Sequence, residues 1–323
     1  MKSFRHINAR TLNEACRLLK DYKGKAKLIA GGTDLLGILK DRVLPDYPEA
    51  IVNIKTIPAL NYIREDAKGL KIGALTTLSQ IAQSSVIKGK YKVLAEAAYA
   101  VAMPQIRNMA TLAGNLCQEV RCWYYRYPHE VGERVLCFRK GRGPCLAVSG
   151  DNRYHAILEG KRCFAVCPSD TAVALTVLDA KIQITGLKKN RIIPVKDFFT
   201  VLGNVLEPEE IIREIQIPKP LEKARQTFLK LTLRRSIDFA IVSVASVIAL
   251  EGGICKNAKI ALGAVAPIPV RAAQAEQALK GKSLDPKTAG EAAEAAVMGA
   301  KPLSMNGYKI KETKVLVQRA LLA

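Results

Sequence analysis

A cysteine-rich segment in the middle of the chain, residues 113–170, constrains the fold more than any other stretch. It holds six of the eight cysteines of the 323-residue sequence. Within it the apolar periodicity of helices and strands stops, and Gly, Arg, Lys and aromatic residues replace the aliphatic ones. A segment of this composition needs something other than an apolar core to hold it, and metal–thiolate bonds are the obvious candidate.

The spacing of these cysteines leaves more than one metal site open. Structural zinc binds four thiolates but favours cysteine pairs about two to four residues apart. The close pairs here are Cys117/Cys122 and Cys163/Cys167, so zinc is a minor alternative. Cys167 precedes Pro168, as the last cysteine of ferredoxin-type runs precedes a proline, which makes Cys167 a further candidate ligand.

The histidines and aromatic residues of the segment are less specific signals. His129 and His155 are candidate ligands, but lone histidines in loops more often lie on the surface, where we expect both. The aromatic residues are more typical of a lid that excludes water from a metal cluster than of a platform on which bases stack. They are Trp123, Tyr124, Tyr125 and Tyr127.

The chain is strongly basic, with a formal net charge of +21 from 50 Lys and Arg against 29 Asp and Glu. The basic residues are spread along the whole chain, whereas a nucleic-acid site needs them gathered in a stripe, so nucleic acid is not expected as a partner. A solubilising surface would account for the charge. If the positive charge attracts a partner, a negatively charged protein steered by this field is a better candidate than nucleic acid.

Nothing in the sequence predicts insertion into a membrane. The first residues have no apolar signal core, which predicts a cytoplasmic protein. The longest apolar run, residues 239–250, is too short to span a bilayer. Disulfides are not expected in that compartment, and Cys16 and Cys255, outside the segment, should be ordinary buried thiols.

Strand and helix patterns alternate on both sides of the segment and indicate a mixed α and β protein. Before it we expect strands at 27–30, 51–54 and 70–75, and helices at 58–63, from 77, and at 93–102. After it we expect a helix at 170–178 and strands at 180–185, 191–199 and 210–217. Beyond a linker at 218–220, strands at 228–233, 240–250 and 258–265 predict an antiparallel sheet, with helices at 271–279, 285–298 and 308–322 on one face. The predicted domains are residues 1–55, 56–217 with the insertion at about 117–167, and 221–323.

Two glycine-containing turns are candidates for binding a diphosphate. Gly31-Gly32 follows a strand and lacks the three spaced glycines of the dinucleotide fingerprint. Glycines let a backbone approach a diphosphate and direct several N–H groups to it, although either turn alone is better explained as a tight connection without a ligand. A similar turn at residues 111–115 makes the pair more specific, because two such turns could clamp one diphosphate between subdomains.

Seven stretches, in this order, resemble the flavoprotein (medium) subunits of the molybdenum hydroxylases, the family of xanthine dehydrogenase and carbon monoxide dehydrogenase. The stretches are FRHINARTLNEACRLL, IAGGTDLL, KIGALTTL, TLAGN, PSDTAVAL, LKLTLRRSIDFAIVSVA and ALGAVAPIPVRA. The resemblance covers essentially the whole chain; Ala9 stands where the family usually has proline and Ala113 where glycine is frequent. It implies an α+β, two-subdomain FAD-binding fold of the vanillyl-alcohol-oxidase (PCMH) type, followed by a smaller α+β C-terminal domain.

The resemblance also implies which residues hold FAD. The residues implied at the diphosphate are Leu28, Ile29, Ala30, Gly31, Gly32, Thr33, Asp34, Leu35, Thr111, Ala113, Gly114 and Asn115. Further implied cofactor contacts are Thr76, Val101, Ala102, Asp170, Ile212 and Lys230. These assignments agree with physical chemistry, because a diphosphate favours backbone amides and the Lys230 cation can tune reduced flavin.

The cysteine-rich segment is absent from most of the family and resembles the insertion of the 4-hydroxybenzoyl-CoA reductase β subunit, which carries a [4Fe–4S] cluster. By this resemblance the four thiolate ligands are Cys122, Cys137, Cys145 and Cys163, a complete set for such a cluster. Cys167 or Cys117 as a substitute ligand remains open. The stretch between Cys145 and Cys163 is longer than in that reductase and more like insertions in anaerobic xanthine dehydrogenase relatives.

The implied function is electron transfer between an external carrier, ferredoxin or NAD, and two partner subunits. These partners are a molybdopterin-binding large subunit and a small [2Fe–2S] subunit. No residue of this chain is expected to be catalytic toward an organic substrate. Alternatives are the FAD subunit of an anaerobic xanthine, purine or aldehyde dehydrogenase, a self-sufficient flavin oxidase, and, in another class, a zinc-stapled basic binding module.

Overall fold

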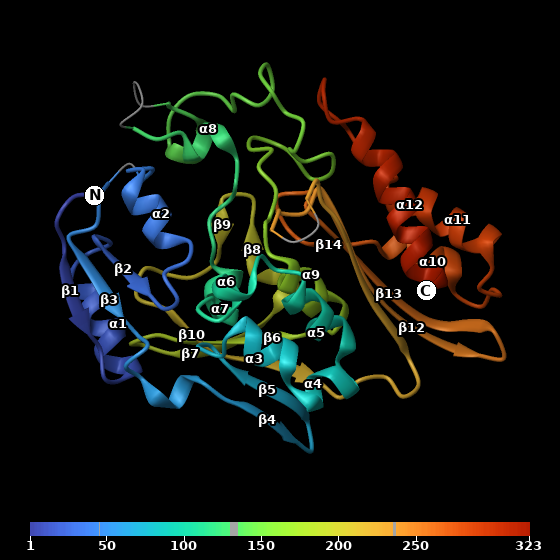
Figure 1. The fold of residues 1–323 in the computed structure, drawn as a ribbon, viewed down its shortest axis with the longest axis horizontal. Helices are drawn as coiled ribbons and strands as arrows, with labels where there is room; N and C mark the ends of the chain where they lie inside the picture. Colours follow the sequence, from blue (N-terminus) through green and yellow to red (C-terminus); the bar gives the residue numbers. More distant parts are fainter. Residues whose placement is uncertain (45, 130–134, 235–236) are drawn as a thin grey trace.

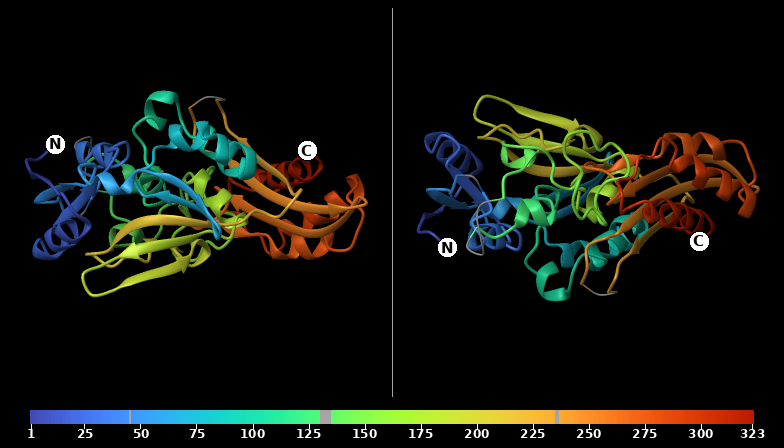
Figure 2. Two further views of the ribbon diagram at one scale, coloured as in Figure 1. Left: turned by 90° about the horizontal axis from the view of Figure 1, so that it is seen from below. Right: turned by 90° about the horizontal axis from the view of Figure 1, so that it is seen from above.

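The computed structural model describes residues 1–44, 46–129, 135–234 and 237–323. Parts of two predicted features lie outside these ranges, namely residues 130–134 of the cysteine-rich segment and 235–236 of the LKLTLRRSIDFAIVSVA stretch. The N-terminal sheet and the C-terminal sheet with its helices stand at opposite ends, with the second subdomain between them (Figures 1 and 2). No helix within the described ranges is both long and apolar enough to cross a membrane.

The first subdomain is a small parallel sheet whose strands run in the order β1-β3-β2. The strands are β1 (Arg5–Asn8), β2 (Ala26–Ile29) and β3 (Ala50–Asn53), with helices α1 (Leu12–Asp21) and α2 (Leu35–Lys40). The apolar face of α1 packs on this sheet and buries Cys16 completely, as predicted for that thiol. The strand β2 leads directly into the Gly31-Gly32 turn, which therefore stands at the end of a buried strand.

The second subdomain is a five-stranded antiparallel sheet packed against helices. The strand order is β4 (Ile63–Asp66), β5 (Gly69–Gly73), β10 (Ile211–Pro218), β6 (Lys181–Thr185) and β7 (Asn190–Pro194). The helices are α3 (Leu78–Gln83), α4 (Ser85–Lys90), α5 (Lys92–Tyr99), α6 (Pro104–Arg107), α7 (Leu112–Leu116) and α9 (Asp170–Val177). Every residue of α9 is buried, because it lies between this sheet and the C-terminal sheet.

Two predicted elements of this subdomain are shorter than expected. The helix predicted at 58–63 is a single 3₁₀ turn, η1 (Pro58–Leu60), and the sequence analysis missed the strand β4 that follows it. The strand predicted at 191–199 ends at Pro194 and continues as the 3₁₀ turn η3 (Val195–Asp197) and the short strand β8 (Phe199–Thr200), which pairs with β9 (Gly203–Asn204). Proline cannot donate a ladder hydrogen bond, which explains the early end of β7.

The C-terminal domain is an antiparallel sheet with helices on one face, as predicted. Its strands are β11 (Arg225–Leu231), β12 (Val242–Glu251), β13 (Ile254–Gly263) and β14 (Val270–Arg271), and its helices are α10 (Ala273–Leu279), α11 (Pro286–Ala296) and α12 (Tyr308–Leu322). The strand predicted from residue 258 starts at Ile254. Gly252 and Gly253 both have positive φ, 55° and 80°, so the tight turn lets Glu251 pair with Ile254.

The cysteine-rich segment has little regular structure, as predicted. It contains the short helix α8 (Trp123–Arg126) and the 3₁₀ turn η2 (Phe138–Lys140). In Figure 1 it runs in green across the top of the molecule, from α2 toward α12. The expectation that it has almost no apolar core is wrong in part, because Cys137 and Cys163 are buried in a small cluster with Ile38 and Val43 of the α2 region.

Candidate cofactor sites

Four of the six cysteines in the segment line one cavity. They are Cys122, Cys137, Cys145 and Cys163, the same four that the sequence resemblance implies as ligands. Tyr124, Tyr125, Phe138 and Leu146 complete most of the wall. All eight cysteines of the chain are free thiols, so no disulfide competes for these four.

The surroundings of the sulfur atoms favour a thiolate at Cys145 and disfavour one at Cys122. The hydrogen bond from Cys163 lowers the pKa of the Cys145 thiol, and backbone N–H groups of Phe164 and Ala147 also point to that sulfur. Burial raises the pKa of the Cys122 thiol to about 11, although the amide of Tyr125 opposes this rise. Amide donors directed at sulfur stabilise negative charge there, as metal-bound thiolates require.

The placement of the four cysteines around a cavity bears on which metal group could fit between them. In the described part of the chain, no three or more His, Cys, Asp or Glu side chains are placed to hold a metal ion. The four cysteines instead stand around a cavity. A four-iron cluster is larger than a single ion and binds each cysteine at a different iron, whereas a zinc ion draws four ligands to one point.

The remaining two cysteines of the segment lie elsewhere. Cys117 and Cys167 line a second hollow, together with Ser169, Asn204 and Pro267. Neither of them lines the cavity of the other four cysteines. The structure thus divides the six cysteines into a group of four and a pair.

The two histidines of the segment differ in environment. His129 is exposed, as expected. The expectation of a surface position is wrong for His155, which is 3 % exposed and whose Nε2 lies 3.3 Å from Cys122 Sγ. Burial and the nearby Lys309 ammonium lower the pKa of His155 to about 4. Its position depends on contacts from the distant C-terminal domain, which no local sequence signal reveals.

The four aromatic residues predicted to form a lid are only partly placed for that role. Tyr124 and Tyr125 line the cysteine cavity. Trp123 lies edge-on to the rings of Tyr154 and His155, and Tyr127 is 40 % exposed.

The first glycine turn has the features of an anion-binding backbone. A Cβ at Gly31 would lie 2.0 Å from the carbonyl oxygen of Met109, so only glycine fits, and Gly32 has a φ of +71°. The amide N–H groups of Gly32, Thr33 and Asp34 donate no backbone hydrogen bond to another described residue. Consecutive free amides around a left-handed residue form a concave anion site.

The second turn lies beside the first but uses its amides internally. The Leu112 and Ala113 amides donate to Thr76 O and Ala74 O, and the Gly114 amide donates to Thr111 Oγ1 at 3.2 Å. The Asn115 side chain is also engaged: its Oδ1 accepts from Ser169 Oγ at 2.7 Å and from Thr171 Oγ1 at 2.6 Å. The second turn is therefore a capped helix start that hydrogen bonds fix to the residues before α3 and to the start of α9.

A buried ion pair joins α9 to the C-terminal sheet. Lys230 Nζ lies 2.7 Å from Asp170 Oδ2 and donates to Ala100 O at 2.9 Å. Burial raises the pKa of the Asp170 carboxyl above its ordinary value, and the Lys230 ammonium opposes the rise. The contact with Ala100 places this pair beside Val101 and Ala102, so four of the predicted flavin contacts come together here.

Arg107, which the sequence analysis missed, fixes the backbone of the same region. Its Nη1 donates to Val101 O at 3.0 Å and to Ala102 O at 2.6 Å. Ala102 has a positive φ of 44°, which is costly for a residue with a Cβ. In the sequence Arg107 is only a single arginine soon after Pro104. That signal is too weak to predict that its side chain holds the backbone of residues 101–102.

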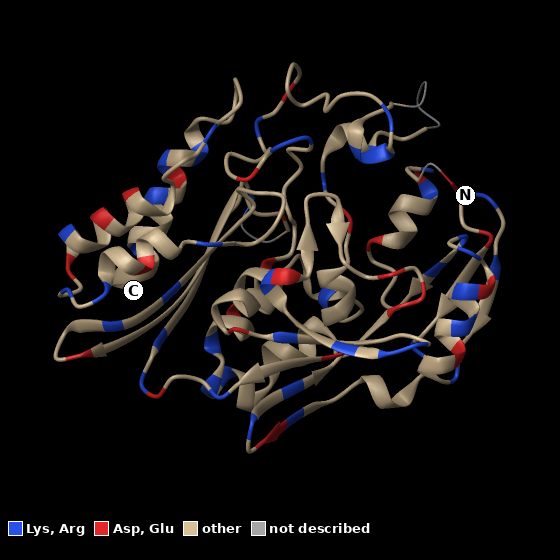
Figure 3. Cartoon of the chain, turned by 180° about the vertical axis from the view of Figure 1, so that it is seen from behind, with Lys and Arg blue, Asp and Glu red and all other residues tan. Residues whose placement is uncertain are grey.

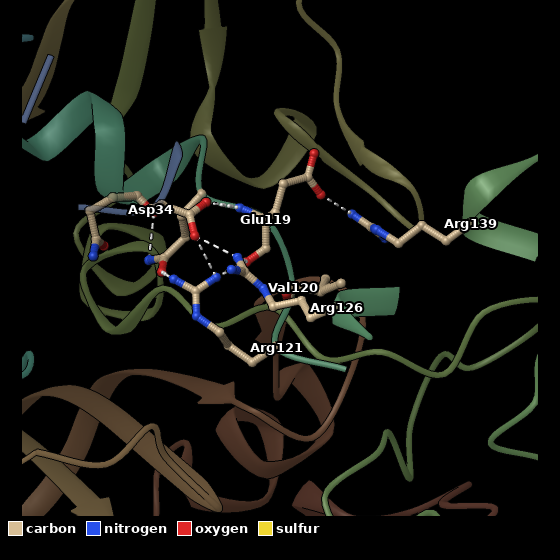
Figure 4. Close-up of polar contacts among 8 residues, drawn as sticks. Asp34, Glu119, Val120, Arg121, Arg126 and Arg139 are labelled. Carbon is tan, nitrogen blue, oxygen red and sulfur yellow. Dashed lines mark hydrogen bonds and ion pairs between the residues drawn. The ribbon is translucent and has the colours of Figure 1, made fainter. Parts of the chain in front are cut away.

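Asp34 faces the cysteine-rich segment. Its Oδ1 lies 2.5 Å from Arg126 Nη2 and 2.9 Å from Arg121 Nη1, and its Oδ2 accepts from the Glu119 amide at 2.8 Å (Figure 4). The side chains of Asp34, Arg121 and Arg126 are about four-fifths buried, at 18 %, 23 % and 19 % exposed. We call these three residues the Asp34 cluster. It connects the first glycine turn to the residues on either side of Cys122.

Further contacts of the Asp34 cluster make it rigid. Arg126 Nε donates to Val120 O at 2.7 Å, and its backbone amide donates to Cys122 O at 2.9 Å. The Arg121 guanidinium stacks on Phe239, 4.5 Å from the ring centroid, and burial lowers its pKa to about 10. A carboxylate in a turn that is predicted to bind a diphosphate indicates that cations lie nearby. This was the sequence signal that could have identified the two arginines.

The other predicted FAD residues are apolar and serve packing. Ile212 is 3 % exposed in the core under the five-stranded sheet, against which Val101 and Ala113 also pack. Leu28 and Ala30 pack on the core of the first subdomain. The remaining two are Ile29, at the end of β2, and Leu35, at the start of α2.

Comparison with known families accounts for both halves of the chain. Residues 2–220 match the family described as "FAD binding domain in molybdopterin dehydrogenase". Residues 227–323 match the "CO dehydrogenase flavoprotein C-terminal domain".

Individual relatives agree with these matches. The chain is 35% identical over 287 residues to the aldehyde oxidoreductase FAD-binding subunit PaoB of Escherichia coli, covering 86% of each. It is 29% identical to the nicotinate dehydrogenase FAD-subunit of Eubacterium barkeri, covering 89% of this chain and 83% of the relative. The structure superposes on a chain of carbon monoxide dehydrogenase from Hydrogenophaga pseudoflava with a TM-score of 0.79 and 27% identity, covering 100% and 97% of the two chains. It superposes on quinoline 2-oxidoreductase from Pseudomonas putida 86 with a TM-score of 0.78, 26% identity and the same coverage.

Proposed function

Because the chain belongs to the FAD-binding medium subunits of the molybdenum hydroxylase family, we propose that it is the electron-transfer subunit of such a complex. The matches confirm the family and the fold expected from the sequence. In the proposed complex the chain binds FAD between its N-terminal subdomains and a [4Fe–4S] cluster in the cysteine cavity. Substrate chemistry takes place on a molybdopterin-binding large subunit, and a small [2Fe–2S] subunit connects that centre to this chain.

The convergence of four free cysteines on one cavity carries the proposal for the cluster. Cys122, Cys137, Cys145 and Cys163 supply a complete thiolate set, and amides near Cys145 stabilise negative charge on its sulfur. Tyr124 and Tyr125 form part of the wall around the sulfur atoms.

The free amides of the first glycine turn carry the proposal for FAD. They receive the diphosphate without a side-chain cation. Lys230, held by Asp170 and Ala100 O, places a positive charge beside the predicted flavin contacts Val101 and Ala102. When bound, FAD exchanges electrons singly or in pairs, which suits a position between a two-electron carrier or substrate and one-electron clusters. The residues of this chain bind and orient the cofactor and tune its charge, and none acts on an organic substrate.

Two kinds of complex are candidates. The cysteine-rich segment resembles that of 4-hydroxybenzoyl-CoA reductase, which favours a complex of that type with ferredoxin or NAD as the external carrier. The 35% identity to an aldehyde oxidoreductase subunit favours an aldehyde dehydrogenase as the second candidate. The eight free thiols suit a reducing compartment, so we place the complex in the cytoplasm.

Substitution of each cysteine by serine tests the cluster. After anaerobic purification, serine at Cys122, Cys137, Cys145 or Cys163 should lower the iron content or convert the electron paramagnetic resonance signal to that of a three-iron cluster, while FAD stays bound. The loss follows because each position binds a different iron.

The other four cysteines provide matched controls. Serine at Cys16, Cys117, Cys167 or Cys255 should leave the iron content unchanged. Loss of the cluster in Cys167→Ser with retention in Cys163→Ser would show that the ligand set is wrong. A bound colourless metal in place of iron would identify a zinc site and leave the flavin as the only route for electrons through this chain.

A further inference from the structure

The buried histidine beside Cys122 has a defined relation to the proposed cluster. His155 is 3 % exposed, and the 3.3 Å between its Nε2 and Cys122 Sγ is a hydrogen-bond distance. Its other ring nitrogen, Nδ1, is also buried and has no hydrogen-bond partner among the described residues. The sulfur is therefore the polar partner that the structure gives this ring.

The ring is held in place from several sides. It lies edge-on to Trp123, with 5.5 Å between the ring centroids and 73° between the planes. The His155 amide donates to Asn152 O at 2.9 Å. Its carbonyl oxygen accepts from Asn306 Nδ2 and from Lys309 Nζ, both at 3.1 Å. Side chains of the C-terminal domain thus fix the backbone that carries the ring.

The contacts also decide which ring nitrogen carries the proton. A neutral imidazole has one N–H and one lone pair. A buried N–H without an acceptor is unfavourable, so the N–H belongs on Nε2, which has the sulfur as acceptor, and the lone pair belongs on Nδ1. This tautomer makes His155 a donor toward Cys122.

We propose that His155 Nε2–H donates a hydrogen bond to the Cys122 thiolate and thereby raises the reduction potential of the [4Fe–4S] cluster; the inference rests on the proposed function. When the cluster accepts one electron from its carrier, negative charge on the ligand sulfur atoms increases. A donor at sulfur stabilises that reduced state more than the oxidised one. His155 is a positioning residue and not a ligand, because the four cysteines already complete the set.

The test measures the midpoint potential of the cluster in the intact flavoprotein by a redox titration followed by electron paramagnetic resonance. His155→Phe keeps a ring against Trp123 and removes Nε2. His155→Gln keeps an amide N–H that can reach the same sulfur. Trp123→Phe is the matched control, because it disturbs the packing and leaves the donor in place. Iron and FAD per chain are measured for every variant.

The expected result is a lower potential in His155→Phe with unchanged iron and FAD, a smaller decrease in His155→Gln, and a potential near that of the wild type in Trp123→Phe. An unchanged potential in His155→Phe, or an equal decrease in Trp123→Phe, would overturn the inference. Loss of iron from both His155 variants would overturn it as well, since His155 would then be a ligand. Absence of iron from the wild-type protein would instead refute the proposed cluster.

Discussion

At the scale of single residues, Gly31 is the position where the two glycine turns touch. Its Cα faces the backbone of Met109, which leads into the second turn, and a Cβ there would lie 2.0 Å from a carbonyl oxygen. The backbone of one of the two turns would have to move to make room for any side chain. Gly31 therefore differs from Gly32 in why it must be glycine. Gly31 has no room for a side chain, whereas Gly32 has a positive φ.

We predict that Gly31→Ala lowers FAD content and destabilises the fold by about 1–3 kcal/mol, the usual cost of forcing a methyl group into packed structure. Gly37→Ala is the matched control, because a Cβ at this position in α2 meets no atom within 4 Å. That variant should keep its FAD and gain slightly in stability. Flavin absorbance and thermal unfolding check both. Full FAD binding in Gly31→Ala would contradict the close approach.

At the scale of elements, the Asp34 cluster links the start of α2 to α8. Its buried ion pairs carry hydrogen bonds on several sides, so removing one partner leaves charged groups without compensation. The first glycine turn and the loop carrying Cys122 are therefore connected, so a shift of one backbone segment displaces the other.

We predict that Arg126→Gln lowers iron content and thermal stability, because it removes an ion pair and a hydrogen bond to Val120 O next to the cysteine cavity. The loss should be about 1.5–3 kcal/mol, the typical range for hydrogen bonds to charged groups. Arg153→Gln, in the same segment, removes an exposed ion pair with Asp151 and should change neither quantity. Equal effects of the two substitutions would argue against the structural role of the Asp34 cluster.

Local patterns predicted most elements, and long-range contacts account for what they missed. The C-terminal sheet and helices follow from apolar periodicity and a Gly-Gly turn. The strand β4 was missed because the exposed run Arg64–Asp66 has no apolar alternation. The environment of His155 could not be predicted, since its partner Asn306 lies far away in the sequence. The carboxylate of Asp34 in a glycine turn indicated a nearby cation, but local pattern could not tell that Arg126 supplies it. The cysteine grouping came from resemblance, because spacing alone left zinc and Cys167 open.

At the scale of the whole molecule, the net charge of +21 creates a positive field around the protein. Lys and Arg are distributed over all parts of the fold (Figure 3). Such a field attracts acidic proteins over a range of about 10 Å at 0.1 M salt, which is the screening length.

We predict that reduction of the bound flavin by an acidic ferredoxin slows steeply as ionic strength rises. Stopped-flow measurements at increasing salt check this expectation. Electron transfer to a small neutral acceptor, which the field cannot steer, should show little salt dependence. A ferredoxin reaction that is equally insensitive to salt would leave the charge with a solubilising role.

The contacts between the cysteine-rich segment and residues 303–309 have a consequence for how the protein is made. Asn306 and Lys309 hold the backbone at His155, and Met305 donates to Asn152, from the other end of the chain. These residues are translated long after Cys163, the last of the four cysteines that line the cavity. The pocket is therefore unfinished on the nascent chain. The proposed cluster can therefore be enclosed only once residues 303–309 have been translated and have docked against residues 152–155.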